Sequence, residues 1–153
     1  MNYIDSSAFV KYYSGEGSEK GSDKIKAIVD KAKDGEESLI SSILLIGEVV
    51  SAFDKWVRLK ILTQEQGAAA ISEFVSDIKE CAEKDTILLE DINLLHMTFS
   101  VDYIVKYHLP TNDALHLYTA LIHKKHISTF ISSDKSLNRA AEKEGFTVYD
   151  PEL

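Results

Sequence analysis

The chain has 153 residues, of which 44% are hydrophobic and 27% charged, a composition typical of one soluble globular domain spanning 1–153. Its net charge of −8, from 25 acidic and 17 basic residues, excludes binding of nucleic acid through a broad basic surface. The sequence has no apolar run of membrane-spanning length, no signal-peptide pattern at its start, and a single cysteine, Cys81, which excludes an internal disulfide and a cysteine zinc site. We therefore expect a cytoplasmic protein.

Short apolar segments alternate with helical patterns along the chain. In chain order the predicted elements are a strand at 3–5, a helix at 8–13, a loop at 14–17, a helix from about 25 to 35, a strand at 38–42, helices at 43–60 and 63–83, a strand at 86–89, helices at 91–108 and 111–123, a strand at 127–131, a helix at 134–144 and a strand at 146–149. This alternation predicts an α/β fold with a mostly parallel five-stranded sheet and helices on both faces.

Helix ends are marked by residues with capping or helix-breaking chemistry: Ser6 or Ser7, Ser42, the Thr63–Gln66 capping box, Pro110 and Gly145.

Three aspartates fall where predicted strands end or helices begin. Asp5 ends the first strand, Asp134 follows the fourth, and Asp113 lies in the first turn of the helix after Pro110. Because the carboxyl ends of parallel strands meet at one edge of a sheet, we expect these side chains to face the same edge. Each aspartate taken alone has a simpler explanation, since Asp is common at helix caps and in first helical turns.

Glu48 favours a shared site more strongly, because it lies inside an apolar helix with no Lys or Arg within reach along that helix. The alternative is a narrow exposed stripe that also contains Ser51, Asp54 and Lys55. Four carboxylates brought together cannot all stay ionised without a cation. An all-oxygen cluster suits Mg²⁺ or Mn²⁺ rather than zinc, and such a site can activate water for in-line displacement at phosphorus.

Four segments carry this pattern in order: YIDSSA at 3–8, IGEV at 46–49, TNDALHL at 111–117 and SSDKSL at 132–137. They resemble the four motifs of PIN-domain proteins, specifically the VapC-like toxin ribonucleases, over nearly the whole chain. The resemblance implies a three-layer α/β/α fold and a Mg²⁺- or Mn²⁺-dependent endoribonuclease that cleaves single-stranded RNA or structured RNA loops. It also implies a homodimer and a small antitoxin partner, which often inserts a segment near the active site.

Carried over position by position, the resemblance assigns catalysis and metal binding to four acids: Asp5, Glu48, Asp113 and Asp134. Ser6 or Ser7 resembles the small hydroxyl residue after the first acid, and Ser132 stands where the family usually has threonine. The implied mechanism is hydrolytic. A metal held by the aspartates, with Glu48 binding directly or through water, activates a water that attacks the phosphodiester.

Four further residues are candidate substrate contacts: Lys11, His116, Lys135 and Arg139. His116 shares a helix face with Asp113, and the alternative is a packed or surface histidine. The three basic side chains lie within a turn or two of the predicted site in sequence, and solvated helix faces are their alternative explanation.

Three other functions compete with the nuclease. A phosphorelay receiver needs paired acids after the first strand, and a haloacid-dehalogenase-type phosphotransferase needs an aspartate at position 7, where this chain has Ser7. Both are disfavoured. The remaining alternative is a catalytically silent PIN-like module that binds RNA or protein.

Overall fold

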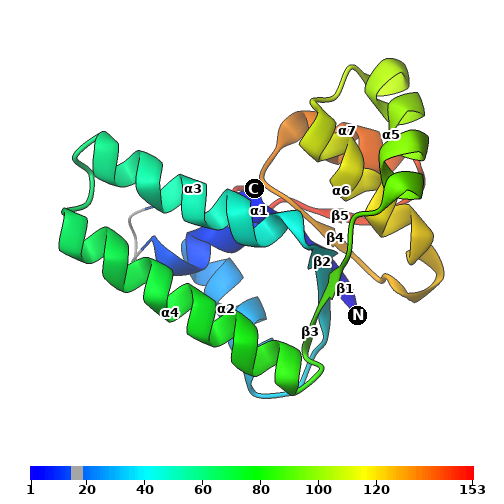
Figure 1. Cartoon of the computed structure of the whole chain (residues 1–153). Helices are drawn as coiled ribbons and strands as arrows, with labels where there is room; N and C mark the ends of the chain where they lie inside the picture. The colour runs from blue at the N-terminus through cyan, green and yellow to red at the C-terminus, as the bar shows by residue number, and fades with distance from the viewer. Residues whose placement is uncertain (15–18) are drawn as a thin grey trace.

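A computed structural model describes residues 1–14 and 19–153 of the chain. Within these residues a single sheet has the strand order β3-β2-β1-β4-β5, and every neighbouring pair is parallel (Figure 1). The predicted α/β fold is therefore confirmed. The predicted loop at 14–17 lies outside the described residues from position 15 onward. The strands are β1 (Asn2–Ile4), β2 (Leu39–Ser42), β3 (Ile87–Glu90), β4 (Phe130–Ile131) and β5 (Val148–Tyr149).

Helices cover both faces of this sheet (Figure 1). One layer consists of α1 (Ser6–Phe9) with the 3₁₀ turn η1 (Val10–Tyr13), α2 (Ser22–Lys33), α3 (Leu44–Arg58) and α4 (Gln64–Glu83). The other layer consists of α5 (Leu94–Tyr107), α6 (Thr111–Ile122) and α7 (Lys135–Lys143), with the 3₁₀ turn η2 (Lys124–His126) before β4. This arrangement has the three layers that the sequence predicted.

Alternation along the strands builds two separate cores. Tyr3 and Phe130 belong to the core under α5, α6 and α7, where their rings stack with centroids 5.0 Å apart. Ile4 and Ile131, the next residues along each strand, belong to the core under α1, α2, α3 and α4. Because successive side chains of a strand point to opposite faces, both faces of the sheet are covered by apolar contacts.

Several element bounds differ from the prediction because local hydrogen bonds decide them. α5 begins at Leu94 and not at position 91, since Asn93 caps it in a capping box with His96. β4 is shorter than predicted because residues 127–129 connect η2 to the strand, and Ile127 donates its N–H to Lys124 O. β5 is shorter because Phe146 donates its N–H to Ala141 O, closing the end of α7 with Gly145 at φ 82°.

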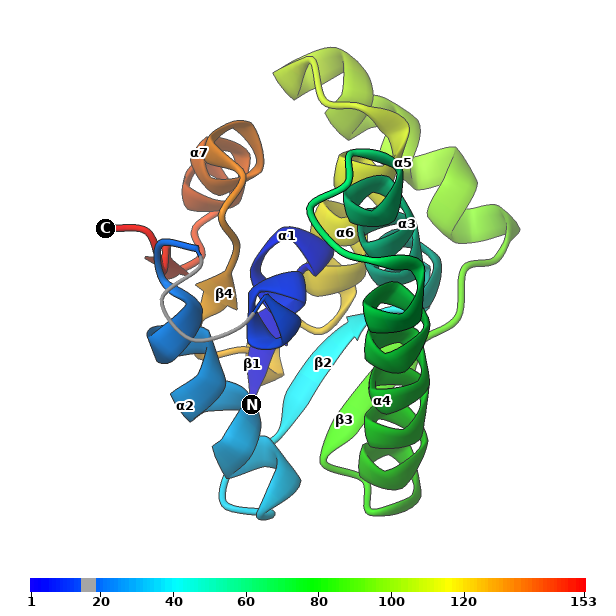
Figure 2. The same ribbon diagram turned by 90° about the vertical axis from the view of Figure 1, so that its left-hand side faces the viewer.

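The predicted capping box of α4 is present, whereas the N-cap of α3 is Ile43 and not the predicted Ser42. The Thr63–Gln66 capping box starts α4, and Ser42 Oγ accepts a hydrogen bond from Leu44 N at 3.2 Å. α3 and α4 lie side by side in Figures 1 and 2, and a Cβ at Gly67 would lie 2.3 Å from Val57 Cγ2. Glycine at position 67 therefore permits the close approach of these two helices. Among the described helices, none is long and apolar enough to cross a membrane.

Candidate active site

The start of α1 lies near the centre of the molecule, where β1 ends (Figure 2). Asp5, at this junction, is 3% exposed, and its carboxylate accepts several hydrogen bonds. Oδ1 accepts from Ala8 N at 3.0 Å, so Asp5 is the cap of α1, and the prediction that Ser6 or Ser7 caps this helix is wrong. A carboxylate accepts this backbone hydrogen bond as well as a hydroxyl does, and Asp5 directly precedes Ser6 in the chain.

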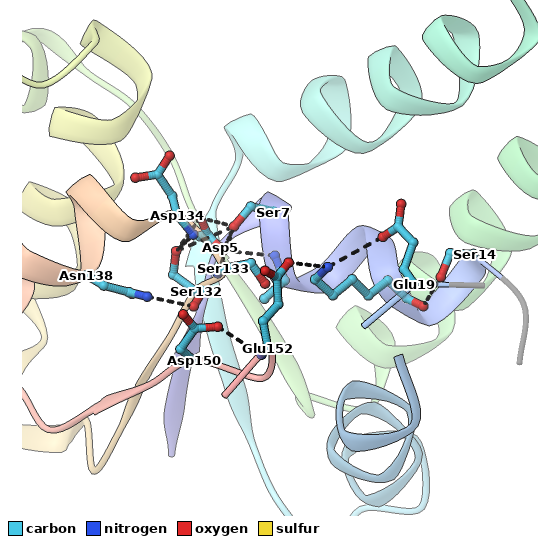
Figure 3. Close-up of polar contacts among 12 residues, drawn as sticks. Asp5, Ser7, Ser14, Glu19, Ser132, Ser133, Asp134, Asn138, Asp150 and Glu152 are labelled. Atoms are coloured by element: carbon cyan, nitrogen blue, oxygen red, sulfur yellow. Dashed lines mark hydrogen bonds and ion pairs between the residues drawn. The ribbon is translucent and has the colours of Figure 1, made fainter. Parts of the chain in front are cut away.

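Two serines hold the Asp5 carboxylate from either side (Figure 3). Ser7 Oγ lies 2.9 Å from both carboxylate oxygens, and Ser132 Oγ donates to Oδ2 at 3.0 Å. The same hydroxyls accept from the loop after β4: Ser133 N donates to Ser7 Oγ and Asp134 N to Ser132 Oγ, each at 3.0 Å. Ser7 and Ser132 therefore link Asp5 to the segment that carries Asp134.

Asp134 is the N-cap of α7, with Oδ1 accepting from Ser136 N at 2.8 Å and Leu137 N at 2.7 Å. The capping explanation for this residue thus holds for one of its two oxygens. Oδ2 has no hydrogen-bond partner among residues 1–14 and 19–153 and is available to a ligand. Lys135 and Arg139 are exposed on the same helix.

Asp113 lies half-buried in the first turn of α6. In the described part of the chain no side chain or backbone group donates a hydrogen bond to it. Burial raises the pKa of the Asp113 carboxyl to about 6, and the negative charges of Asp134, Asp5 and Glu48 add to this rise. Asp113 is therefore within electrostatic reach of the other three acids that the sequence grouped with it.

Glu48 turns from α3 toward α6 and is not part of an exposed stripe. Its Oε1 accepts from Asn112 Nδ2 at 2.9 Å, and its Oε2 lies 2.7 Å from His116 Nε2. Burial raises the pKa of Glu48. The hydrogen bond and charge of His116, together with hydrogen bonds from Ser6 and Asn112, lower this pKa by more, so the net pKa is below its ordinary value. The carboxylate is thus held ionised, in one orientation.

His116 is 1% exposed, and both of its ring nitrogens are engaged within the protein. Nδ1 lies 2.7 Å from the hydroxyl of the buried Tyr3, and Nε2 contacts Glu48. Burial opposes the charged imidazole, but Glu48 outweighs this effect and raises the pKa of His116. The prediction of a substrate contact at His116 is therefore corrected, because this side chain is enclosed and acts on Glu48.

Sequence reasoning missed Asn112 and Tyr3 as members of this site. Asn112 and His116 are four residues apart on α6, a spacing that places both on one helix face and lets them hold a single carboxylate. This four-residue spacing is the sequence pattern from which the role of Asn112 could have been predicted. The role of Tyr3 depends on the packing of β1 under α6, for which the sequence carries no local pattern.

Lys11 forms ion pairs with two glutamates. Its Nζ lies 2.8 Å from Glu152 and 3.5 Å from Glu19, and the side chain is buried (Figure 3). The predicted phosphate contact at Lys11 is therefore corrected as well, since its ammonium group is paired with carboxylates.

The acids supply oxygen donors only, which is the ligand chemistry of Mg²⁺ and Mn²⁺. The raised pKa of Asp113 shows that ionising the whole group is costly without a counter-charge, so the donor set fits a divalent cation. Within residues 1–14 and 19–153, however, no three His, Cys, Asp or Glu side chains are already grouped closely enough to hold a metal ion. Asp5, Asp134 and Glu48 each use oxygens for hydrogen bonds within the protein, and a bound cation would compete with these hydrogen bonds.

The sequence profile of the PIN domain matches residues 3–143. The chain belongs to the PIN-domain family. PIN domains are generally nucleases, and the acids of this one lie on four segments of the matched region. The fold of this PIN domain is similar to the crystal structure of PAE2754 from Pyrobaculum aerophilum, with a TM-score of 0.61 and 20% sequence identity over 99% of this chain and 90% of the other. No curated protein matches it in sequence.

Proposed function

We propose that this PIN domain is a Mg²⁺- or Mn²⁺-dependent endoribonuclease that hydrolyses phosphodiester bonds of RNA. One observation supports the proposal: burial, with the added negative charges of Asp134, Asp5 and Glu48, raises the pKa of the Asp113 carboxyl to about 6. A group of acids in this state calls for a divalent cation.

Asp5, Asp113 and Asp134 would hold the cation, and Glu48 would bind it directly or through water. When bound, the cation would supply charge neutralisation for the phosphodiester and lower the pKa of the attacking water. The residues of the chain itself orient the ligands. Ser7 and Ser132 fix Asp5 from two sides, while Asn112 and His116 fix Glu48. Lys135 and Arg139 are exposed beside Asp134 and stay candidates for contacts with substrate phosphates.

The direct test is the variant Asp5→Asn, assayed on single-stranded RNA and on a hairpin with an RNA loop. Asn can still cap α1, so the fold is expected to persist while Mn²⁺-dependent cleavage is lost. EDTA is expected to stop the wild-type enzyme. Full activity in a clean Asp5→Asn preparation would refute the assignment of the site.

A catalytically silent binding module is the second candidate, because no three ligands in the described residues are already grouped for a metal. Calorimetric titration with Mn²⁺ separates the two functions. The nuclease proposal predicts saturable binding that Asp113→Asn removes, and the silent module predicts neither metal binding nor cleavage.

The toxin role follows the resemblance to VapC-like ribonucleases. We propose that the protein acts in the cytoplasm as the toxin of a type II pair and is neutralised by a cognate antitoxin. Induced expression in a bacterial host is expected to arrest growth, and the Asp5→Asn variant is expected to leave growth unchanged. Growth arrest by the variant equal to that by the wild type would contradict RNA cleavage as its cause.

The homodimer requires an apolar contact surface, and α5 offers one at the edge of the molecule (Figure 1). Exposed apolar side chains gathered on one helix mark protein contacts, and we propose that a second copy of the chain covers them. They are Leu94, Leu95, Met97, Phe99, Val101 and Val105, of which Leu94 is 79% exposed.

A further inference from the structure

A basic pocket of about 170 Å³ lies between the end of α5 and α7. Of the described residues that line it, none is acidic, although the chain as a whole carries a net charge of −8. Its lining includes four basic side chains from two helix regions: Lys106, His108, Arg139 and Lys143. The lining of this pocket is therefore locally basic.

The cations of the pocket are largely free of carboxylate partners. Within residues 1–14 and 19–153, Arg139 makes one side-chain hydrogen bond, to Ser136 Oγ at 3.2 Å, and forms no ion pair. The chain's other arginine, Arg58, pairs with Asp54 at 2.8 Å. Lys106 is the exception in the pocket, since it pairs with Glu144 at 2.7 Å. An unpaired guanidinium beside a hydroxyl is suited to bind a phosphate group.

The pocket begins next to the proposed active site. Ser136 lines it, and the backbone N–H of the same residue donates to Asp134 Oδ1 at 2.8 Å. Arg139 follows Asp134 by five residues, which is about 7.5 Å along the axis of α7. An extended polymer whose reacting phosphate lies at the acids can therefore reach the pocket with a nearby phosphate.

Tyr107 adds an aromatic ring to the basic groups. Its ring lies 4.9 Å from Lys106 Nζ and 5.8 Å from Lys143 Nζ, and its hydroxyl donates to Glu144, which fixes the ring in place. The same ring stacks on Tyr103, with ring centroids 6.4 Å apart, and packs against the core, so its contacts hold the two lysines at the pocket.

We infer that this pocket binds a non-reacting backbone phosphate of single-stranded RNA, with Arg139 and Lys143 as its contacts. The inference rests on the proposed function, which it extends by naming where the strand is held beside the site of cleavage. It also accounts for RNA binding by an acidic chain, since a small local group of cations replaces the broad basic surface that the sequence lacks.

The test measures binding of a fluorescent 12-nucleotide single-stranded RNA by anisotropy in EDTA, so that cleavage does not interfere. Arg139→Ala/Lys143→Ala is expected to weaken binding about tenfold and to reduce the slope of log K against log salt by about 0.7, because one phosphate contact is lost. The matched control is Lys55→Ala/Arg58→Ala, which removes the same two charges from exposed positions on α3. This control is expected to retain wild-type affinity and slope.

The charge-conserving variant Arg139→Lys/Lys143→Arg is expected to keep most of the affinity. Arg139→Ala/Lys143→Ala is also expected to bind single-stranded DNA of the same sequence more weakly than the wild type does, by a similar factor, because the contact is made to phosphates. Equal affinity and slope for the pocket variant and the α3 control would overturn the inference. If the wild type still cleaves RNA in that case, only the pocket assignment fails. If the wild type binds RNA through the pocket without cleaving it, the nuclease proposal fails and the pocket stands.

Discussion

Glu48 on α3 and His116 on α6 are joined by a 2.7 Å contact between Oε2 and Nε2, 68 residues apart in sequence. The contact explains how an apolar helix carries a carboxylate, since the buried imidazole supplies a partner that no Lys or Arg of that helix could. Tyr3 completes the arrangement from beneath, with its hydroxyl 2.7 Å from His116 Nδ1.

Replacing His116 is expected to affect stability and activity together. His116→Ala leaves Glu48 and the buried Tyr3 hydroxyl without this partner, a loss of about 1–3 kcal/mol of unfolding free energy. RNA cleavage is expected to fall because Glu48 is no longer oriented, with partial rescue by His116→Gln, which keeps a donor. Thermal unfolding and kcat/KM report the two effects. The exposed His126→Ala serves as control, and wild-type kcat/KM in His116→Ala would contradict the orienting role.

The same pair predicts a bell-shaped dependence of stability on pH. The lowered pKa of Glu48 gives stability that is present above 4.5 and is lost as pH falls through the folded value. The raised pKa of His116 gives stability that is present below 6.5 and is lost as pH rises through the folded value. The difference in Tm between wild type and Glu48→Gln is therefore expected to be greatest between pH 4.5 and 6.5. A difference that stays constant from pH 4 to pH 9 would argue against the ion pair.

Asp113 is expected to destabilise the metal-free protein at neutral pH. Its folded pKa of about 6 exceeds the ordinary value of 3.8, so the folded state loses stability as pH rises through this range. Asp113→Asn is therefore expected to raise Tm in EDTA at pH 8 and to have little effect at pH 3.5, while abolishing cleavage. Asp102→Asn, at an exposed position on α5, is the control. A lower Tm for Asp113→Asn at pH 8 would contradict the charge crowding.

Mn²⁺ is expected to relieve this crowding. At a free concentration 100 times its Kd, it is expected to add about 2.7 kcal/mol to the unfolding free energy at pH 7.5. The gain is expected to shrink at pH 5, where protons compete for Asp113, and to vanish in Asp113→Asn. Differential scanning fluorimetry with and without EDTA measures the shift, and an equal shift in wild type and variant would place the cation elsewhere.

Two neighbouring serines give a matched comparison in the loop after β4. Ser132 Oγ bonds to Asp5 and to Asp134 N, whereas Ser133 Oγ is buried with no hydrogen-bond partner in the described chain. Ser132→Ala is expected to cost about 1–3 kcal/mol of stability and to reduce cleavage, while Ser133→Ala is expected to be neutral or stabilising. Chemical denaturation and cleavage assays test this, and equal effects of the two substitutions would remove the proposed role of Ser132.

The apolar face of α5 predicts the oligomeric state. Val101→Glu/Val105→Glu places charge on this face and is expected to convert a dimer into a monomer. Light scattering coupled to size-exclusion chromatography measures the mass. Val75→Glu, at an exposed apolar position on α4, is the control and is expected to leave the mass unchanged. An unchanged mass for the α5 variant would show that another surface forms the dimer.

The sequence could predict what local patterns encode. The alternation of apolar segments with helical patterns predicted the parallel sheet that brings Asp5 and Asp134 to the same edge. Partners from distant segments lay beyond such patterns. The pairing of His116 with Glu48 depends on how α3 packs beside α6, and the burial of Lys11 depends on its pairing with Glu152, 141 residues away. For this reason, sequence patterns alone placed His116 and Lys11 among the candidate substrate contacts.

Asp5 has two roles. Its Oδ1 caps the N-terminus of α1 by accepting a hydrogen bond from Ala8 N, and the same carboxylate is proposed to bind the cation. Losing the charge and losing the helix start are thus separable events at this position. Asparagine removes only the charge, whereas alanine removes both. We therefore expect related proteins that have lost cleavage but kept the fold to carry asparagine at this position. An aspartate there is expected in relatives that still cleave.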